Sequence, residues 1–333
     1  MKNTAINILE IARIANVHPS TVSRALNGST LIKEETRLRI QEIAEQHNYV
    51  PNSFAQSMQH GKSFVWGVIV PEISNSFSFY SIVIDTIEQV LSQYGYSFVI
   101  GTSHSDATTE LQAIRTMLSR QVDALVICAP TAHTDEYVQS VSQMIPIIMC
   151  DTKHPTIYDS VYVDDKIGII EALKHLKEKG HTRIGCIADH ISTSRTDTFI
   201  ECLKECNLPI YEELIYYTNE IGNQGGYEGL HALYQRGTIP TALFTTRDNI
   251  ALGAIRAATE LHLDIPSQIS IIGYDDAGFS RYLPQNLTTI HQPVKEIGEN
   301  VADILVRRLE GKETSQTPTQ VRLLSELIIR ETT

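Results

Sequence analysis

The stretch NILEIARIANVHPSTVSRALNG, residues 7–28, contains two short amphipathic helix patterns separated by a turn. The first pattern is an apolar stripe at the spacing of one helix face: Ile8, Ile11, Ala12 and Ala15. Asn7 precedes this stripe as an N-cap, and residues 16–18 form the turn. Pro19 suits the first turn of a second helix, which ends at Asn27-Gly28 and buries Val22, Ala25 and Leu26. With a third helix from about Lys33 to Asn48, the sequence predicts an N-terminal three-helix unit.

The second helix carries a polar face opposite its apolar one. This face consists of Ser20, Ser23, Arg24 and Asn27, again at the spacing of one helix side. An arginine can form paired hydrogen bonds with guanine in the major groove, and serine or asparagine can bind phosphates or base edges. A solvated surface helix would show the same face, so spacing alone does not decide. Two short helices joined by a tight turn and followed by a third indicate a DNA-binding helix-turn-helix.

From Val65 onward, short apolar strands alternate with amphipathic helices. The predicted strands are Val65–Val70, Phe98–Thr102, Ala124–Cys128, Ile147–Asp151, Arg183–Ile187, Ala242–Thr245 and Ile269–Tyr274. The predicted helices are Ser78–Tyr94, Thr108–Arg120, Asp165–Lys179, Thr196–Cys206, Gly225–Arg236, Asp248–Leu261 and Val294–Gly311. Short continuous strands between helices are typical of parallel sheets covered on both faces. Because so many units exceed one sheet, we expect an α/β fold, with an all-α helix-turn-helix unit followed by a core of two doubly wound lobes.

Composition and charge limit the class of protein. Hydrophobic residues make up 42% and charged residues 20% of the chain, as in ordinary globular proteins. No run of about 18 apolar residues and no apolar signal core is present, so we expect a cytoplasmic protein without membrane contact. The net charge of −12 is uneven, because residues 1–62 carry seven Lys/Arg and five Glu, a net +2 that leaves −14 for the rest. Salt screens charges beyond about 8 Å, so the acidic core hardly opposes phosphate contacts of the N-terminal unit.

The cysteines do not suggest a metal site or a disulfide framework. Their number is odd, and they are Cys128, Cys150, Cys186, Cys202 and Cys206. None forms a Cys-x-x-Cys pair, so we predict buried, reduced thiols and expect neither a metal nor a cofactor.

Three groups of polar and aromatic residues follow predicted strands of the core. They are Asn75 to Phe79 after the first strand, Arg195 at the start of a helix, and Asp275 at the end of a strand. Ligands of α/β proteins bind at strand ends, and an aromatic face with a fixed arginine and a carboxylate suits the C–H faces and hydroxyls of a sugar. Arg247, directly before Asp248, suits a carboxylate or phosphate of an effector or an ion pair within the protein, and both readings stay open.

The stretch from Asn7 to Gly28 resembles the DNA-binding headpiece of the LacI/GalR repressor family, most specifically in Thr21-Val22-Ser23-Arg24-Ala25-Leu26-Asn27. The resemblance continues in Glu35-Thr36-Arg37, Tyr49-Val50-Pro51-Asn52, Gly67-Val68-Ile69-Val70-Pro71, Gly180-His181-Thr182-Arg183-Ile184, Ala251-Leu252-Gly253-Ala254, Ile272-Gly273-Tyr274-Asp275-Asp276 and Leu287-Thr288-Thr289-Ile290. It implies a core similar to type I periplasmic sugar-binding proteins, with an effector between the lobes. The implied domains are a headpiece (1–50), a hinge (51–62) and a core (63–333), whose first lobe is about 63–162 and 292–323 and whose second is about 163–291 and 324–333.

The resemblance also implies site residues. The expected DNA contacts are Ser20, Thr21, Ser23, Arg24, Asn27, Asn52 and Met58. The expected effector contacts are Asn75, Phe77, Phe79, Arg195, Arg247, Asp248 and Asp275. Four positions depart from the family pattern: His18 replaces the usual Ser or Thr cap, Met58 the Leu that wedges into the minor groove, Gln56 a hinge Arg, and Thr198 a Gly. Residues 52–59 are predicted to become helical only on DNA.

The implied function is a sequence-specific transcriptional regulator, a repressor of carbohydrate-utilisation genes acting as a homodimer on a pseudo-palindromic operator. Its effector is expected to be a sugar, sugar phosphate or sugar acid. A periplasmic-type binding protein is a rival reading, but the helix-turn-helix argues against it. A sugar-active enzyme is a second rival, yet the sequence has no Gly-x-Ser-x-Gly elbow, no Walker-type loop and no evident catalytic pair.

Overall fold

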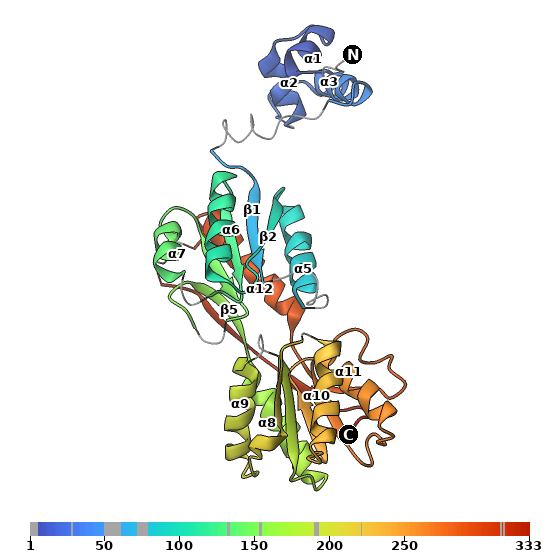
Figure 1. The fold of residues 1–333 in the computed structure, drawn as a ribbon. Helices are drawn as coiled ribbons and strands as arrows, with labels where there is room; N and C mark the ends of the chain where they lie inside the picture. Colours follow the sequence, from blue (N-terminus) through green and yellow to red (C-terminus); the bar gives the residue numbers. More distant parts are fainter. Residues whose placement is uncertain are drawn as a thin grey trace. The chain divides into compact units, whose positions relative to one another are not determined.

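The computed structural model describes residues 6–27, 29–49, 61–71, 79–131, 134–152, 155–189, 193–220, 222–313, 315 and 317–333 (Figure 1). The chain divides into two compact units, Met1–Phe64 and Val65–Thr333. We call them the N-terminal unit and the core unit. No helix in the described part of the chain is long and apolar enough to cross a membrane.

The N-terminal unit contains the helices α1 (Ile8–Ile14), α2 (Pro19–Leu26) and α3 (Glu34–Gln46). Asn7 and Glu10 form a reciprocal capping box at the start of α1, which satisfies backbone N–H groups that have no partner inside the helix. The three helices bury a small core made of Ile11, Ala12, Ala15, Val22, Ala25 and Ile40. The predicted three-helix unit is therefore present, with helix ends within two residues of the expected ones.

The first lobe of the core unit is built on a six-stranded parallel sheet in the order β11-β5-β4-β3-β1-β2. Its strands are β1 (Val65–Val70), β2 (Ser97–Thr102), β3 (Ala124–Cys128), β4 (Ile147–Cys150), β5 (Asp159–Asp164) and β11 (Gln320–Leu324). Its helices are α5 (Phe79–Gln93), α6 (Ala107–Ser119), α7 (Asp135–Ser142) and α12 (Val294–Leu309). Successive residues of a strand point to opposite faces, so Trp66, Val68 and Val70 pack with α5 and α12 while Ile69 packs with α6 and α7.

The second lobe repeats this plan in the strand order β12-β10-β9-β8-β6-β7. Its strands are β6 (Ile184–Asp189), β7 (Ile215–Thr218), β8 (Ala242–Thr245), β9 (Ser270–Asp275), β10 (Thr288–His291) and β12 (Glu326–Ile328). Its helices are α8 (Asp165–Glu178), α9 (Thr193–Glu205), the short 3-10 helix Glu212–Leu214, α10 (Asn223–Gln235) and α11 (Asp248–Glu260). All neighbouring strands are parallel except β12, which runs antiparallel to β10.

The chain passes between the lobes three times: from β5 to α8, from β10 to α12, and from β11 to β12. The first and third passages are joined by Ser325. Its hydroxyl donates to the Asp164 carbonyl at 2.8 Å and accepts from the Gly168 N–H at 3.2 Å. These two connections therefore lie side by side at the junction of the lobes.

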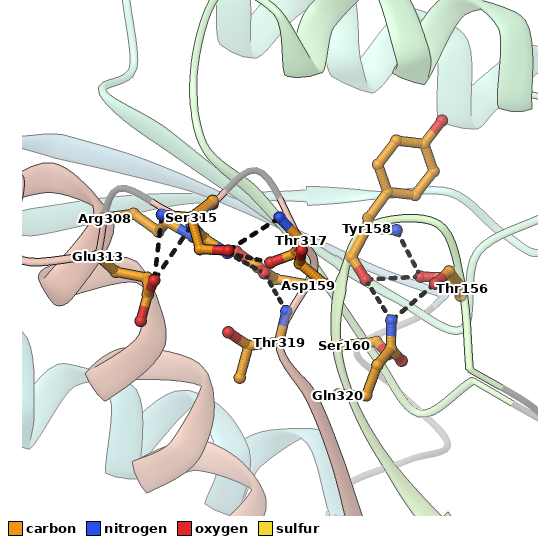
Figure 2. Close-up of polar contacts among 10 residues, drawn as sticks. All are labelled: Thr156, Tyr158, Asp159, Ser160, Arg308, Glu313, Ser315, Thr317, Thr319 and Gln320. Atoms are coloured by element: carbon orange, nitrogen blue, oxygen red, sulfur yellow. Dashed lines mark hydrogen bonds and ion pairs between the residues drawn. The ribbon is translucent and has the colours of Figure 1, made fainter.

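An ion pair between half-buried Arg308 and buried Asp159 holds the segment that leads into the third passage (Figure 2). Arg308 of α12 donates to both carboxylate oxygens of Asp159, with N–O distances of 2.9 and 2.8 Å. The same guanidinium donates to the carbonyls of Ser315 and Thr317, and the Thr319 N–H donates to Asp159 at 2.7 Å. Figure 2 shows these groups converging from α12, the following loop and β5, so that Asp159 and Arg308 together fix the start of β11.

The predicted α/β architecture of a helix-turn-helix unit and two parallel-sheet lobes is confirmed. All seven predicted strands and seven predicted core helices are present, with ends within three residues of the expected ones. The sequence interpretation missed β5, β7, β10, β11, β12 and α7.

Candidate functional site

The helix α2 presents the polar face expected from the sequence. Val22 and Ala25 are completely buried, whereas Ser20, Arg24 and Asn27 are exposed and Thr21 and Ser23 are half-buried. Arg24 forms no ion pair with any other residue that the structure describes. Its side chain is therefore available to a ligand outside the protein.

The start of α2 is capped by the residue that departs from the family pattern. The Ser20 N–H donates to His18 Nδ1 at 3.3 Å, and the Ser20 hydroxyl lies 2.8 Å from the same nitrogen. A histidine thus performs the capping role that a serine or threonine hydroxyl usually performs. Nearby, Arg39 of α3 donates to the Ala15 carbonyl at 3.0 Å and ties α3 to the end of α1.

Several expected site residues lie outside the described residues. They are Asn52 and Met58 among the DNA contacts, and Asn75 and Phe77 among the effector contacts, and the hinge residue Gln56 is outside as well.

In the core unit, Arg195 of α9 is the centre of a cluster of charged side chains. Its Nε lies 3.4 Å from Asp165 Oδ2, and its Nη1 lies 3.6 Å from Asp275 Oδ1. Nη1 also donates to the Thr246 carbonyl at 3.1 Å, and the guanidinium carbon lies 3.9 Å from the centre of the Tyr274 ring. These contacts fix the guanidinium plane before any ligand arrives.

The charges of the cluster affect one another strongly. Burial alone lowers the pKa of Arg195, but Asp165, Tyr274 and Asp275 raise it, and the net pKa lies above its ordinary value. Burial raises the pKa of Asp275, although Arg195 lowers it. Arg195 therefore keeps its charge, and its positive charge favours the ionised form of Asp275.

Asp275 ends β9 in an unusual backbone conformation. Its φ is 111°, in the region that side-chain-bearing residues rarely adopt, and its Oδ1 accepts from Gln292 Nε2 at 2.7 Å. Strained positions of this kind are common at ligand-binding sites. The strain and the bond from Gln292 together fix the carboxylate at the end of the strand.

The first lobe contributes Asp151, directly after β4. Its Oδ2 accepts a hydrogen bond of 2.6 Å from the hydroxyl of Tyr80. Burial raises the pKa of Asp151, and the positive charges of Arg195 and Arg247 lower it. This carboxylate of the first lobe is therefore close enough to interact with two guanidinium groups of the second lobe.

Arg247 forms a further ion pair within the second lobe. Arg247 Nε lies 3.6 Å from Oδ2 of Asp189, which ends β6 and is completely buried. The ion pair within the protein that the sequence left open for Arg247 is thus formed. We use the name "polar cluster" for Asp151, Asp165, Asp189, Arg195, Arg247 and Asp275.

Two expected effector contacts lie behind this cluster. Asp248 is 1% exposed and accepts from Thr289 Oγ1 at 2.6 Å, from the Ala277 N–H at 2.7 Å and from the Ser280 hydroxyl. Burial first, and then the charge of Asp275, raises the pKa of Asp248 to about 7. Phe79 is 9% exposed and packs edge-on against Tyr80 at 5.0 Å. Both side chains are buried in this structure, and their role as effector contacts stays a prediction.

Sequence reasoning missed Asp151, Asp165, Asp189 and Gln292 as parts of this site. Asp151 ends a predicted strand, so the strand-end argument that found Asp275 would also have found it. Asp189 lies beyond the predicted end of its strand, and Gln292 follows a strand that was not predicted. No pattern in the sequence marked them.

Other polar and hollow features of the core unit lie elsewhere. A shallow groove of about 250 Å³ lies between β2 and α6, and it includes Ile100, Thr109, Thr116 and Arg120 but none of the expected site residues. All five cysteines are buried free thiols, and Cys150 Sγ lies 3.2 Å from Cys128 Sγ. The described residues contain no group of three acidic, histidine or cysteine side chains arranged to hold a metal ion.

Comparison with known proteins relates both units to one family. Residues 7–52 match the family described as "Bacterial regulatory proteins, lacI family", and residues 173–333 match a "Periplasmic binding protein-like domain". The ribose operon repressor of Haemophilus influenzae is 30% identical over 308 residues, which is 91% of each chain. The HTH-type transcriptional repressor PurR of Actinobacillus pleuropneumoniae is 29% identical over 328 residues, which is 97% of each chain. The structure of the Lac repressor bound to ONPG in the repressed state superposes with a TM-score of 0.87 at 25% identity, over 99% of this chain and 100% of that one.

Proposed function

Because the chain belongs to the LacI family of bacterial regulatory proteins, we propose that it is a sequence-specific repressor of carbohydrate-utilisation genes whose operator affinity a small sugar-like effector controls. The observation that carries DNA recognition is the exposed face of α2. Ser20, Arg24 and Asn27 lie together on it, and the opposite face is buried against α1 and α3. A helix held in this way can enter the major groove as a rigid reader.

Arg24 is the residue that we assign to a base edge. Its side chain is exposed and forms no ion pair among the described residues, so binding DNA does not require it to leave a protein partner. Paired hydrogen bonds from an arginine to guanine typically contribute about 1–3 kcal/mol of discrimination. Ser20, Thr21, Ser23 and Asn27 would supply the neighbouring phosphate and base contacts.

The test begins with selection of binding sites from a random DNA library by the full-length chain, followed by fluorescence anisotropy on the selected site. Arg24→Ala should weaken specific binding by about 1–3 kcal/mol and relax preference at one position of each half-site. Arg13→Ala, an exposed arginine of α1, is the matched control and should change affinity equally for all sequences. If Arg24→Ala behaves like this control, Arg24 contacts phosphate and the assignment is wrong.

The effector is assigned to the polar cluster. This assignment is supported by the chemistry of the cluster. A fixed arginine, several carboxylates and an aromatic ring meet there at strand ends, and together they suit a polyhydroxylated molecule. Charged groups of both lobes interact there, so a ligand that contacts both lobes favours one arrangement of the lobes over others. That differential affinity is what can couple effector binding to DNA binding.

Arg195→Ala tests this assignment. A thermal-shift screen of the wild-type chain over sugars, sugar phosphates and sugar acids identifies a ligand, and calorimetry then compares it with the variant. Loss of a charged partner in a buried site typically costs about 1.5–3 kcal/mol, so effector affinity should fall at least about tenfold. Operator binding without effector should be unchanged. Full effector affinity in the variant would place the site elsewhere.

The remaining parts of the proposal follow from this function. One helix-turn-helix covers only a half-site, so a homodimer on a pseudo-palindromic operator is the proposed active form. We place the protein in the cytoplasm, where DNA is, and assign it no enzymatic activity, because its relatives are named as repressors. Light scattering of a dilute sample tests the dimer, and a monomer that binds operator with full affinity would contradict it.

A further inference from the structure

The cap of α2 determines which ring nitrogen of His18 carries the proton. The Ser20 N–H donates to His18 Nδ1 at 3.3 Å, as an N–H of the first helical turn does to an N-cap acceptor. A ring nitrogen that accepts this bond has a free lone pair and no proton. His18 is therefore the neutral tautomer with its proton on Nε2, and its Nδ1 can only accept.

This tautomer sets the direction of a second hydrogen bond. The Ser20 hydroxyl oxygen lies 2.8 Å from the same Nδ1, which is hydrogen-bond distance. Because Nδ1 has no proton to give, the hydroxyl of Ser20 is the donor. A hydroxyl has a single proton, so the Ser20 oxygen is left with lone pairs alone for any further partner.

The further partner of Ser20 must therefore be a hydrogen-bond donor. Ser20 is exposed and shares the polar face of α2 with Arg24, so its oxygen is accessible to DNA. Phosphate oxygens are acceptors and offer no proton to it. In the major groove, the donors are the amino groups of adenine and cytosine, whereas guanine and thymine present acceptors there. The group that fits this oxygen is an amino group of a base.

We propose that His18 sets the base preference of Ser20: by accepting the hydroxyl proton, it makes Ser20 an acceptor that reads adenine or cytosine, against guanine or thymine, at one strand position of each half-site. This inference rests on the proposed DNA-binding function of α2 and deepens it, because it assigns Ser20 to a base and not to phosphate. His18 is a positioning residue that acts through Ser20. A serine or threonine hydroxyl in its place could accept or donate, and would leave the direction of the Ser20 hydroxyl open.

The test is selection of binding sites from a random DNA library by the full-length chain at about pH 8, above the ordinary pKa of imidazole. The wild type is compared with His18→Asp, His18→Ser and Ser20→Ala. Aspartate and serine are both good N-caps, so α2 keeps its start, and circular dichroism checks that the helix content is unchanged. The wild type should prefer adenine or cytosine by about twofold to tenfold at one position of each half-site, as expected for a single hydrogen bond.

The variants separate the cap itself from the direction of the Ser20 hydroxyl. A carboxylate only accepts, so His18→Asp should keep the preference for amino bases, while its negative charge weakens binding to all sequences. A hydroxyl can accept or donate, so His18→Ser should bring the preference close to parity although α2 is still capped. Ser20→Ala removes the reading oxygen and should abolish the preference at the same position.

Several results would overturn the proposal. They are a preference for guanine or thymine at the position that depends on Ser20, an undiminished preference in His18→Ser, or its loss in His18→Asp. A Ser20→Ala variant that loses affinity equally for all sequences would place Ser20 on phosphate and reject the proposal as well. If the wild type enriches no DNA sequence at all, the proposed function itself fails. A selected site whose preferences do not depend on His18 or Ser20 rejects this inference alone.

Discussion

The two lobes of the core unit share a strand order but bury different chemistry. Reading from one edge, β2-β1-β3-β4-β5-β11 in the first lobe corresponds to β7-β6-β8-β9-β10-β12 in the second. Each sheet is covered by two pairs of helices, α5 with α12 and α6 with α7 in the first lobe, and α8 with α9 and α10 with α11 in the second. The topology thus places strand ends equivalently, and the residues at those ends make the difference.

In the first lobe, the bidentate ion pair of Arg308 with buried Asp159 involves none of the residues of the polar cluster. Among its described residues, the first lobe contributes Asp151 to the cluster, and Tyr80 donates a hydrogen bond to that carboxylate. The second lobe places its buried charges at the cluster itself, in Arg195, Arg247 and their carboxylate partners. Lobes of similar fold therefore place their charges differently: the first lobe uses an ion pair to fix its chain, and the second lobe gathers its charges in the proposed effector site.

The largest effect should follow from removal of the first lobe's ion pair. Arg308→Ala leaves the Asp159 carboxylate, which is 7% exposed, without its paired donors. Breaking a buried pair in this way typically costs about 3–5 kcal/mol of unfolding free energy. Urea unfolding followed by fluorescence measures it directly, because the single tryptophan, Trp66, is completely buried in this lobe.

The neighbouring residue provides the control. Arg307 pairs with Asp303 one helical turn away, and both side chains are largely exposed, at 45% and 63%. Arg307→Ala should therefore cost no more than about 0.5 kcal/mol. Equal shifts for the two variants would show that Arg308 does not fasten the lobe. Circular dichroism of the same samples shows whether the second lobe unfolds together with the tryptophan signal or separately.

Much of this fold could be predicted from the sequence, and the missed parts share a physical reason. The predicted strands are short apolar runs, and most of them lie inside the sheets, where both faces are covered. The missed strands β5, β7, β10, β11 and β12 lie at or beside the sheet edges. Edge strands admit polar residues, as in Gln320 and Arg322 of β11, both exposed, so no continuous apolar run marks them.

The candidate site was predictable only in part, because the order of the strands in the sheet decides which of its residues become neighbours. Arg24 and its neighbours lie on one helix, so their spacing revealed a shared face directly. Arg195 and Asp275 were found through strand ends and family resemblance. Their partners Asp165 and Asp189 come from elements whose neighbours are set by strand order, and the sequence does not give that order.

A second prediction compares how closely helices pack in the two lobes. In the second lobe, a Cβ atom on Gly226 of α10 would lie 1.9 Å from the carbonyl oxygen of Ile250 in α11. In the first lobe, a Cβ atom on Gly298 of α12 would lie 2.7 Å from the Thr86 Cβ in α5. Neither atom can rotate away, so each substitution requires a backbone shift, and the shorter contact at Gly226 requires the larger one. Gly226→Ala should therefore cost about 3 kcal/mol and Gly298→Ala less, about 1–2 kcal/mol. Alanine favours both helices equally, so propensity cancels in the comparison. Urea unfolding by circular dichroism provides the two values, and a larger loss for Gly298→Ala would reverse the proposed order of packing.

The smallest effect concerns pH and Asp248, the carboxyl group that the second lobe buries behind its polar cluster. Burial raises its pKa from 3.8 to about 7 in the folded protein, so between these values the folded state holds a proton that the unfolded state has released. Folding therefore takes up a proton in this window. The contribution of Asp248 to stability is fully present at low pH and is lost as pH rises through the folded-state pKa of about 7. Between pH 6 and pH 7 the loss amounts to about 1 kcal/mol, and Asp248→Asn should abolish it, because an amide does not titrate. Asp106, the N-cap of α6, is the control of opposite sign: hydrogen bonds from the Thr109 N–H and hydroxyl lower its pKa below the ordinary value. Its contribution is lost only as pH falls into the acid range, so Asp106→Asn should leave the decline between pH 6 and pH 7 in place. Urea unfolding of the wild type and both variants at these two pH values decides the matter, and an unchanged decline in Asp248→Asn would show that this carboxyl group is ionised in the folded protein, held by its three hydrogen-bond donors.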